Sequence, residues 1–261
     1  MVIQQPRLLK VLLVGESCID EYEVGEVTRI SPEAPVPILL NTSINIKKGM
    51  AENVKSNLLA LGCETTFFTN KRDKIIKRRF IDKKSNQQLL RQDVEQRIKP
   101  LMISDFNHVA EDSVDVVVIS DYCKGLITPK LAAQLCTKYK YKVYVDSKKE
   151  DLSCFPYSVI KINELENEYS RNLPDTSTKV VTLGSEGAIC EGERYTSKKV
   201  KVHDVTGAGD VFLAALATIA STKGLQSALQ IAVRLASKSV EHFGTYTITN
   251  EDLKEAGYFN D

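Results

Sequence analysis

Residues 204–217 read Asp204-Val205-Thr206-Gly207-Ala208-Gly209-Asp210-Val211-Phe212-Leu213-Ala214-Ala215-Leu216-Ala217. The apolar second half, rich in alanine and leucine, predicts a core helix that covers 207–220. Two glycines and an alanine at its start leave backbone N–H groups unobstructed and pointing in one direction. Such a helix N-terminus attracts anions through its unpaired donors and through the helix dipole. The stretch therefore predicts an anion site at the head of a buried helix.

A carboxylate lies at the same place. Asp210 could take a proton from a hydroxyl while the backbone of Gly207, Ala208 and Gly209 stabilises charge on a transferred phosphoryl group. The alternative is that Asp210 only caps or lines the first turn of the helix. The segment by itself leaves both interpretations open.

From residue 112 onward, predicted strands alternate with predicted helices. The strands are expected at 114–120, 143–146, 158–162 and 179–183, and the helices at 129–139, 207–220 and 225–242. Thr128 is a suitable N-cap for the first of these helices, with Pro129 in its first turn. Earlier in the chain, 8–15 reads as a buried strand and 50–61 as a helix. This alternation predicts a parallel sheet with helices on both faces.

Two segments of the N-terminal half differ from this pattern. Residues 24–46 contain Pro32, Pro35 and Pro37, which favours edge strands and turns. Residues 75–81 and 88–94 alternate apolar with charged side chains, as in a half-exposed ribbon. We expect them to form a small β lid, contributed by about 21–47 and 75–94, on a single α/β domain that spans 1–261.

Composition excludes several classes of function. The net charge of +1 provides no field that would draw the protein to nucleic acid or to a membrane surface, and no apolar run reaches 18 residues. The six cysteines contain no Cys-x-x-Cys pair and are expected to be reduced thiols. The three histidines are far apart, which makes a structural zinc site unexpected.

The motifs together resemble the ribokinase-like carbohydrate kinases. Residues 204–210 match the C-terminal signature of that family, and further resemblances follow in family order at 15–22, 86–91, 120–125, 145–148, 163–166 and 181–187. Arg29-Ile30-Ser31-Pro32-Glu33-Ala34-Pro35-Val36-Pro37 resembles a narrower group. It is similar to the lid segment of the D-glycero-D-manno-heptose 7-phosphate kinases, which supply a lipopolysaccharide precursor.

The resemblance implies a ribokinase-like three-layer α/β/α sandwich with a mainly parallel central sheet and a small β lid. It also implies that ATP and Mg²⁺ serve to phosphorylate the anomeric hydroxyl of the heptose 7-phosphate, giving the 1,7-bisphosphate. The implied catalytic residues are Asp210 as general base and Gly207, Ala208 and Gly209 as anion hole. The candidates for sugar contacts are Asp20, Gly49 and Asn53, and those for the distal phosphate are Arg29, Lys77 and Arg79. The nucleotide is expected at Asn163, Glu164, Leu165, Glu166, Thr182, Gly184 and Gly187, with Asn163 and Glu166 organising Mg²⁺ through water.

Several of these residues have a simpler interpretation. Asn163 and Glu166 lie one helical turn apart, which is also the spacing of a capping pair. Lys77 and Arg79 belong to a charged run of the kind that is usually a solvated face. Asp20 could be a turn residue, and Thr182 to Gly184 could simply be a strand end that enters a turn.

The sequence also departs from the family pattern. Gly49-Met50 stands where the family has paired glycines, so Met50 is expected to crowd the hinge over the sugar. Glu16 replaces an aspartate, and Val233 replaces an asparagine near the adenine. About 30 residues are expected to be missing between Asn70 and Lys71, and 166–180 is also short. These departures keep two alternatives open: a kinase for another sugar, like fructokinase or ribokinase, or a non-catalytic sugar- or nucleotide-binding protein.

The lid also bears on assembly. In the family the lids of two protomers often clasp each other, and the ribbon at 75–94 would expose a strand edge unless it is paired. We therefore expect a homodimer formed through the lid. The use of ATP and the reduced cysteines suggest a cytoplasmic protein.

Overall fold

The computed structural model describes residues 8–70 and 74–259, and eight strands of this part form the central sheet. Their order is β12-β11-β10-β9-β8-β7-β1-β4. The strands are β1 Lys10–Gly15, β4 Glu64–Phe68, β7 Val116–Asp121, β8 Val143–Ser147, β9 Ser158–Asn163, β10 Thr178–Thr182, β11 Ala188–Cys190 and β12 Glu193–Tyr195. All neighbours from β4 to β10 pair in parallel, and β11 and β12 extend the sheet in antiparallel fashion.

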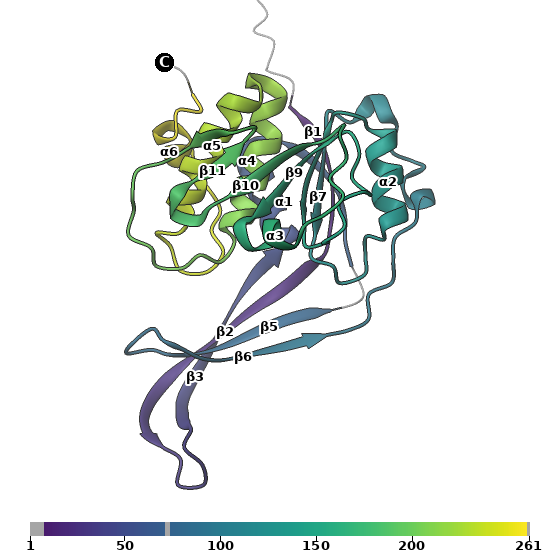
Figure 1. The fold of residues 1–261 in the computed structure, drawn as a ribbon. Helices are drawn as coiled ribbons and strands as arrows, with labels where there is room; N and C mark the ends of the chain where they lie inside the picture. Colours follow the sequence, from purple (N-terminus) through teal and green to yellow (C-terminus); the bar gives the residue numbers. More distant parts are fainter. Residues whose placement is uncertain (1–7, 71–73, 260–261) are drawn as a thin grey trace, which may run out of the picture.

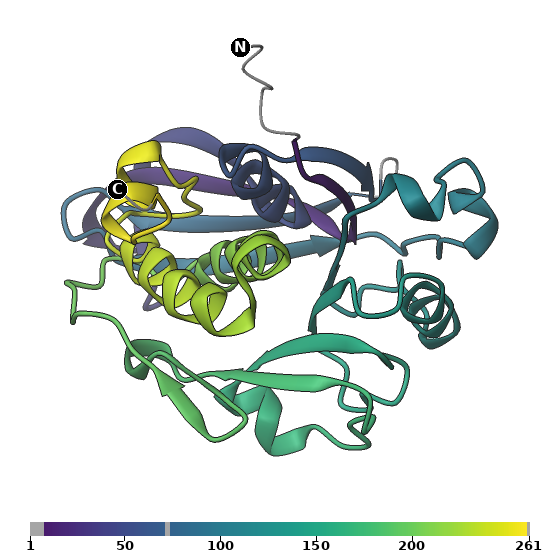
Figure 2. The same cartoon turned by 90° about the horizontal axis from the view of Figure 1, so that it is seen from above.

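Helices cover both faces of this sheet. The helices are α1 Ala51–Ala60, α2 Pro129–Lys138, α3 Glu164–Tyr169, α4 Ala208–Lys223, α5 Leu225–Ser239 and α6 Asn250–Glu255. Within β1, Val11 and Leu13 join the apolar cluster of α1, α4 and α5, whereas Leu12 and Val14 join the cluster that contains α2. Figure 2 shows α4, α5 and α1 packed side by side, away from α2. Because β1 and β7 are buried on both faces, their sequences read as nearly continuous apolar runs.

The predicted helices are confirmed, and local chemistry explains their ends. Thr128 Oγ1 accepts a hydrogen bond from the Leu131 backbone N–H at 3.2 Å, and Pro129 follows in the first turn of α2. Helix α4 is buried along most of its length, from Asp210 to Ile219. That burial accounts for its nearly unbroken apolar sequence.

The lid is a separate four-stranded sheet in the order β3-β2-β5-β6. Its strands are β2 Ser17–Ile30, β3 Pro37–Met50, β5 Ile75–Asp82 and β6 Gln88–Glu95. It projects from the α/β body, and the β2–β3 hairpin reaches furthest (Figure 1). The proline content of 24–46 favoured edge strands and turns; β3 lies at the edge of this sheet, whereas β2 lies between β3 and β5. Pro32 and Pro35 lie in the hairpin loop and Pro37 is the first residue of β3, so no proline interrupts a strand.

In the described part of the chain, no helix combines the length and the apolar character needed to cross a bilayer. The predicted deletion point between Asn70 and Lys71 adjoins residues 71–73, which lie outside the described residues. Met50 is the residue before α1 and is buried, with its side chain in the apolar cluster that contains α2. Its bulk therefore lies in the core, although its backbone has a positive φ of 56°.

Candidate active site

Several predicted site residues, among them Asn163, Glu166 and Asp210, lie at the carboxyl edge of the central sheet, where β7, β8 and β9 end beside the start of α4. This edge is the usual ligand position in open parallel α/β sheets. A cavity of about 150 Å³ lies there, and residues from all four elements line it, among them Tyr122, Asp146, Lys161, Gly209 and Asp210. The lid joins the body next to it, because β2 begins two residues after β1 ends.

The loop before α4 has the geometry of an anion site. Gly207 precedes the helix with a φ of 82°, a backbone conformation that favours glycine. Asp204 shapes the turn, since its Oδ1 accepts from the Thr206 backbone N–H at 2.9 Å and its Oδ2 from that of Gly244 at 2.9 Å. The N–H of Ala208 donates to the Val205 carbonyl at 3.3 Å.

The three residues predicted for the anion hole therefore differ in whether their backbone N–H groups are available to a ligand. Within the described parts of the chain, the backbone N–H groups of Gly207 and Gly209 remain without an acceptor, while that of Ala208 is used in the turn. The two glycines are the donors available to a phosphoryl oxygen. Gly209 also leaves room for the ammonium group of Lys161, because a Cβ on residue 209 would lie 2.9 Å from the Lys161 Nζ.

Asp210 is buried in the first turn of α4, with 4% of its surface exposed. Its Oδ2 accepts from the Asn53 Nδ2 at 3.0 Å, and its Oδ1 accepts from the Tyr122 hydroxyl at 2.8 Å. Burial raises the pKa of Asp210 to about 6; Asp146 adds to the rise, and the hydrogen bonds from Asn53 and Tyr122 oppose it. Such a carboxylate is ionised at neutral pH and close to the range where a general base is most effective.

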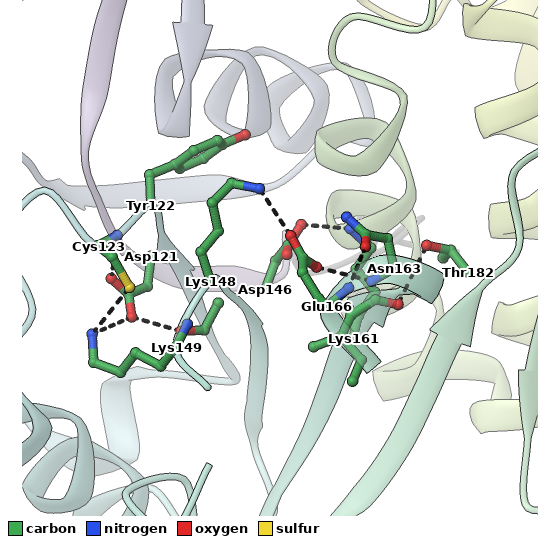
Figure 3. Close-up of polar contacts among 12 residues, drawn as sticks. Asp121, Tyr122, Cys123, Asp146, Lys148, Lys149, Lys161, Asn163, Glu166 and Thr182 are labelled. Carbon is green, nitrogen blue, oxygen red and sulfur yellow. Dashed lines mark hydrogen bonds and ion pairs between the residues drawn. The ribbon is translucent and has the colours of Figure 1, made fainter. Parts of the chain in front are cut away.

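Two ion pairs line the same cavity as Asp210, and Figure 3 shows them. Lys161, 5% exposed, donates to Asp146 Oδ2 at 2.7 Å, and Lys148 donates to Glu166 Oε1 at 2.8 Å. The four charges come from three places: the end of β8, the strand β9 and the start of α3. Lysines at this position can balance phosphate charge once a ligand displaces their present partners.

Asn163 and Glu166 form the capping pair that the simpler interpretation predicted. Asn163 Oδ1 accepts from the Glu166 backbone N–H at 2.8 Å, and Glu166 Oε2 accepts from that of Asn163 at 2.9 Å. Burial raises the pKa of Glu166, but the hydrogen bond from Lys148 and that from Asn163 outweigh it and keep the pKa below its usual value. Both side chains still line the small cavity. Capping and a role at the cavity are therefore compatible.

A second cavity of about 680 Å³ lies beside the first, a volume in the usual range for a small-ligand site. Lys161, Asn163 and Gly209 line both cavities. The larger one is also lined by the remaining predicted nucleotide residues apart from Glu166, namely Glu164, Leu165, Thr182, Gly184 and Gly187. Val233 lies in its wall together with Val205 and Phe212.

The predicted sugar residues lie on the other side of Asp210, at the base of the lid. Asp20 Oδ1 accepts from Arg79 at 2.5 Å, and both residues are buried. A Cβ on Gly49 would lie 1.9 Å from Asp20 Oδ2, so only glycine leaves this carboxylate in place. Lys77 lies over the Tyr122 ring, with its Nζ 5.4 Å from the ring centroid. Asp20 is thus a strand residue and not a turn residue.

Arg29 is not brought to this group. It is exposed in the distal part of β2, close to the hairpin tip, and does not line either cavity. Four further polar residues line the small cavity although they were not predicted as site residues, namely Tyr122, Asp146, Lys148 and Lys161. The available signal was their position at or just beyond the carboxyl ends of predicted parallel strands, where such sheets place ligand contacts.

Comparison with known proteins finds similarity to carbohydrate kinases. Residues 162–252 match the pfkB family carbohydrate kinase. The bifunctional protein HldE of a Nitratiruptor species is 31% identical over 300 positions, covering 94% of this chain and 64% of that protein. HldE of Gluconobacter oxydans is 27% identical over 314 positions, covering 97% and 65%. The chain therefore spans slightly less than two thirds of the length of these relatives. Both alignments exceed its 261 residues, which is consistent with internal deletions.

Solved structures share the fold over nearly the whole chain. Phosphofructokinase-2 from Escherichia coli in complex with potassium superposes with a TM-score of 0.71 and 16% identity, covering 97% of this chain and 99% of the other. Ribokinase from Thermotoga maritima gives 0.69 and 16%, with 97% and 100% covered. The resemblance to the ribokinase-like carbohydrate kinases and the predicted three-layer fold are confirmed.

Proposed function

Since this chain is related to the pfkB carbohydrate kinases and has a ribokinase-like fold, we propose that it transfers the γ-phosphoryl group of ATP to a sugar hydroxyl. The observation that carries this proposal is the position of Asp210. Its buried carboxylate lines the small cavity and accepts from Asn53 of α1, in the same helical turn as the free N–H of Gly209. A base and an anion site are thus side by side.

The proposed reaction is an in-line displacement. The sugar hydroxyl gives its proton to Asp210 as its oxygen attacks the γ-phosphorus; the bond to the β–γ bridging oxygen breaks, and ADP departs. The N–H groups of Gly207 and Gly209 stabilise charge on the transferred group. Asp20, Gly49 and Asn53 orient the sugar in this proposal, and Lys77 and Arg79 face its anionic end.

The larger cavity is the proposed nucleotide site. Its apolar wall, with Val205, Phe212 and Val233, suits a base, and Gly209 at the junction of the cavities would meet the γ-phosphate. Asn163 and Glu166 would hold Mg²⁺ through water, and the ion would supply positive charge that offsets the charge of the phosphates. Asn163 and Glu166 fit a hard cation that keeps its waters, because they present oxygen donors to the small cavity while remaining in their cap.

The proposed acceptor is D-glycero-D-manno-heptose 7-phosphate, phosphorylated at its anomeric hydroxyl. The lid segment at 29–37, the HldE relatives and the cationic pair Lys77 and Arg79 support this choice. Phosphorus NMR of the heptose phosphate with ATP should show a new anomeric phosphate signal that grows in step with ADP. Faster turnover of fructose 6-phosphate or ribose would reassign the acceptor. Sugar binding by calorimetry with no transfer to any sugar would favour a non-catalytic binding protein.

A homodimer through the lid belongs to the same proposal. The outer face of the lid, defined here as Ile44, Ile46, Leu90 and Val94, exposes apolar side chains, with 56% and 66% of Ile44 and Ile46 accessible. Ile44 pairs with Glu23, Glu23 with Phe80, and Phe80 with Leu90, so the side chains of Ile44 and Leu90 lie on the same face of the sheet. Ile46 and Val94 follow at even spacing along the same strands and therefore share this face. A second copy of this face would cover it. The free thiols and the need for ATP suggest that this assembly works in the cytoplasm.

The double variant Ile44→Lys/Ile46→Lys is expected to be a monomer, because four lysines facing each other across a two-fold axis repel and bury charge. Light scattering should report half the wild-type mass. Leu59→Lys, at an exposed position of α1, is the matched control and should remain dimeric. A monomeric wild type would contradict the proposed interface.

A further inference from the structure

Tyr122 contacts the proposed base, Asp210, although it takes no part in the proposed proton and phosphoryl transfer. Its hydroxyl donates to Asp210 Oδ1 at 2.8 Å, and its ring lies near two lysines, with the Nζ atoms of Lys77 and Lys148 each 5.4 Å from the ring centroid. Lys77 belongs to the lid, and Lys148 follows β8 and lines the small cavity. The phenol therefore contacts the proposed base, and its ring lies near one lysine of the lid and one of the α/β body.

We infer that Tyr122 is a positioning residue that orients the Asp210 carboxylate and keeps it ionised for proton transfer. The inference rests on the proposed kinase function and adds a specific role to it. Asp210 has two oxygens, and each accepts from one neutral donor, Asn53 on Oδ2 and Tyr122 on Oδ1. With both oxygens held, the carboxylate cannot rotate about its Cβ–Cγ bond, and its remaining lone pairs point in fixed directions.

A buried glutamate fixes Tyr122 in turn. Glu16 is fully buried, and its Oε2 accepts from the Tyr122 backbone N–H at 2.8 Å. Its Oε1 accepts from the backbone N–H groups of Lys124 and Leu126, each at 3.2 Å. One side chain thus ties the end of β1 to the loop after β7. Glu16 stands where the family has an aspartate. Its side chain reaches across to the loop after β7 and accepts from three backbone N–H groups of that loop.

Two cation–π contacts stabilise the position of the ring. An ammonium group near an aromatic face is attracted by the negative charge of that face, and more strongly when the ammonium group is desolvated. Lys148 is also paired with Glu166, and Lys77 extends from the lid strand β5. The Tyr122 ring therefore has little freedom to swing away from Asp210.

The charged groups and hydrogen bonds around Asp210 determine whether loss of the Tyr122 hydroxyl raises or lowers the pKa of Asp210. Asp146 from β8 raises the pKa of Asp210, Lys161 from β9 lowers it, and the Tyr122 hydrogen bond lowers it as well. Cys18 from β2 is near, but burial raises its pKa to about 12, so it is a neutral thiol. A hydrogen bond donated to a carboxylate favours the charged form. Loss of the Tyr122 hydroxyl should consequently raise the pKa of Asp210.

The test is Tyr122→Phe, which keeps the ring and its two lysines and removes one oxygen. Activity of the wild type should fall as the pH drops through about 6, where Asp210 takes up a proton. In the variant this acidic limb should move to higher pH by up to about one unit, and kcat should fall by about tenfold or more at neutral pH. KM for ATP should change less than twofold, because the ring still packs against Lys77 and Lys148.

Tyr139→Phe is the matched control. The Tyr139 hydroxyl is buried and has no hydrogen-bond partner in the described part of the chain, so its removal should leave the pH profile unchanged. Carbon NMR of ¹³C-labelled aspartate, assigned with Asp210→Asn, would follow the Asp210 carboxyl directly and should show its midpoint raised in Tyr122→Phe. An active wild type whose profile and carboxyl titration match those of Tyr122→Phe would overturn the inference alone. A wild type that transfers no phosphoryl group would refute the proposed function and the inference together.

Discussion

Asp210→Asn is expected to lower kcat by about a thousandfold, because the amide cannot accept the proton of the sugar hydroxyl. The substitution keeps the size of the side chain and leaves the N–H groups of Gly207 and Gly209 in place. KM for ATP should therefore change little. Steady-state kinetics with the preferred sugar, at saturating ATP and neutral pH, would measure both quantities.

Folding should survive this substitution, which distinguishes a chemical role from a structural one. Burial raises the pKa of Asp210 to about 6, so the carboxylate is ionised at neutral pH but its buried charge lowers the stability of the native protein. A neutral amide removes that unfavourable charge, and the thermal midpoint should equal or exceed that of the wild type. Asp175→Asn, in the exposed loop before β10, is the control and should retain full activity. Near-normal turnover in Asp210→Asn would refute the assignment of the base.

Gly49→Ala is expected to raise KM for the acceptor by about tenfold to a hundredfold. The added Cβ would lie 1.9 Å from Asp20 Oδ2 and 2.6 Å from the Cys18 Sγ, so the carboxylate must move. Misplacing a charged hydrogen-bond partner of a ligand costs about 1.5–3 kcal/mol. KM for ATP should stay within about twofold, because the larger cavity is lined by none of these three residues.

A glycine substitution that strains the backbone far from the site should not raise KM for the acceptor while leaving KM for ATP unchanged. Gly192→Ala is the control: it strains a surface turn, but its added methyl group meets nothing within 4 Å. It should lower the thermal midpoint and leave both KM values unchanged. An unaltered acceptor KM in well-folded Gly49→Ala would remove Asp20 from the proposed sugar site.

The elements that could be predicted from the sequence are those whose cause is local. Thr128 and Pro129 start α2 through contacts within one turn, and the apolar runs of β1 and β7 reflect burial on both faces. In the lid, the prolines at 32, 35 and 37 favoured edge strands and turns, and of the two strands that flank them β3 is an edge strand whereas β2 is not. Whether those prolines interrupt a strand depends on where the hairpin turns, and the chain turns at the prolines themselves.

The candidate site also has features that local sequence could predict and features that it could not. The motif at 204–210 alone indicated an anion site with a carboxylate beside it, since glycine content and a helix start act over a few residues. Its relation to Asn53 and Tyr122 could not be predicted, because those hydrogen bonds join residues 157 and 88 positions apart. The arrangement also decided which donors are available: the Ala208 N–H is used in a turn, and Lys161 lies beside Gly209.

The sequence by itself determined the strand–helix alternation, the helix ends and the residue types of the anion loop, because short-range sterics and hydrogen bonds govern them. Tertiary structure alone decided that Asp210 is buried between two neutral donors, that Glu16 fixes the Tyr122 loop and that Arg29 lies apart from the site. These features depend on which strands become neighbours in the sheet. That choice is made by the packing of the whole core, and no short segment encodes it.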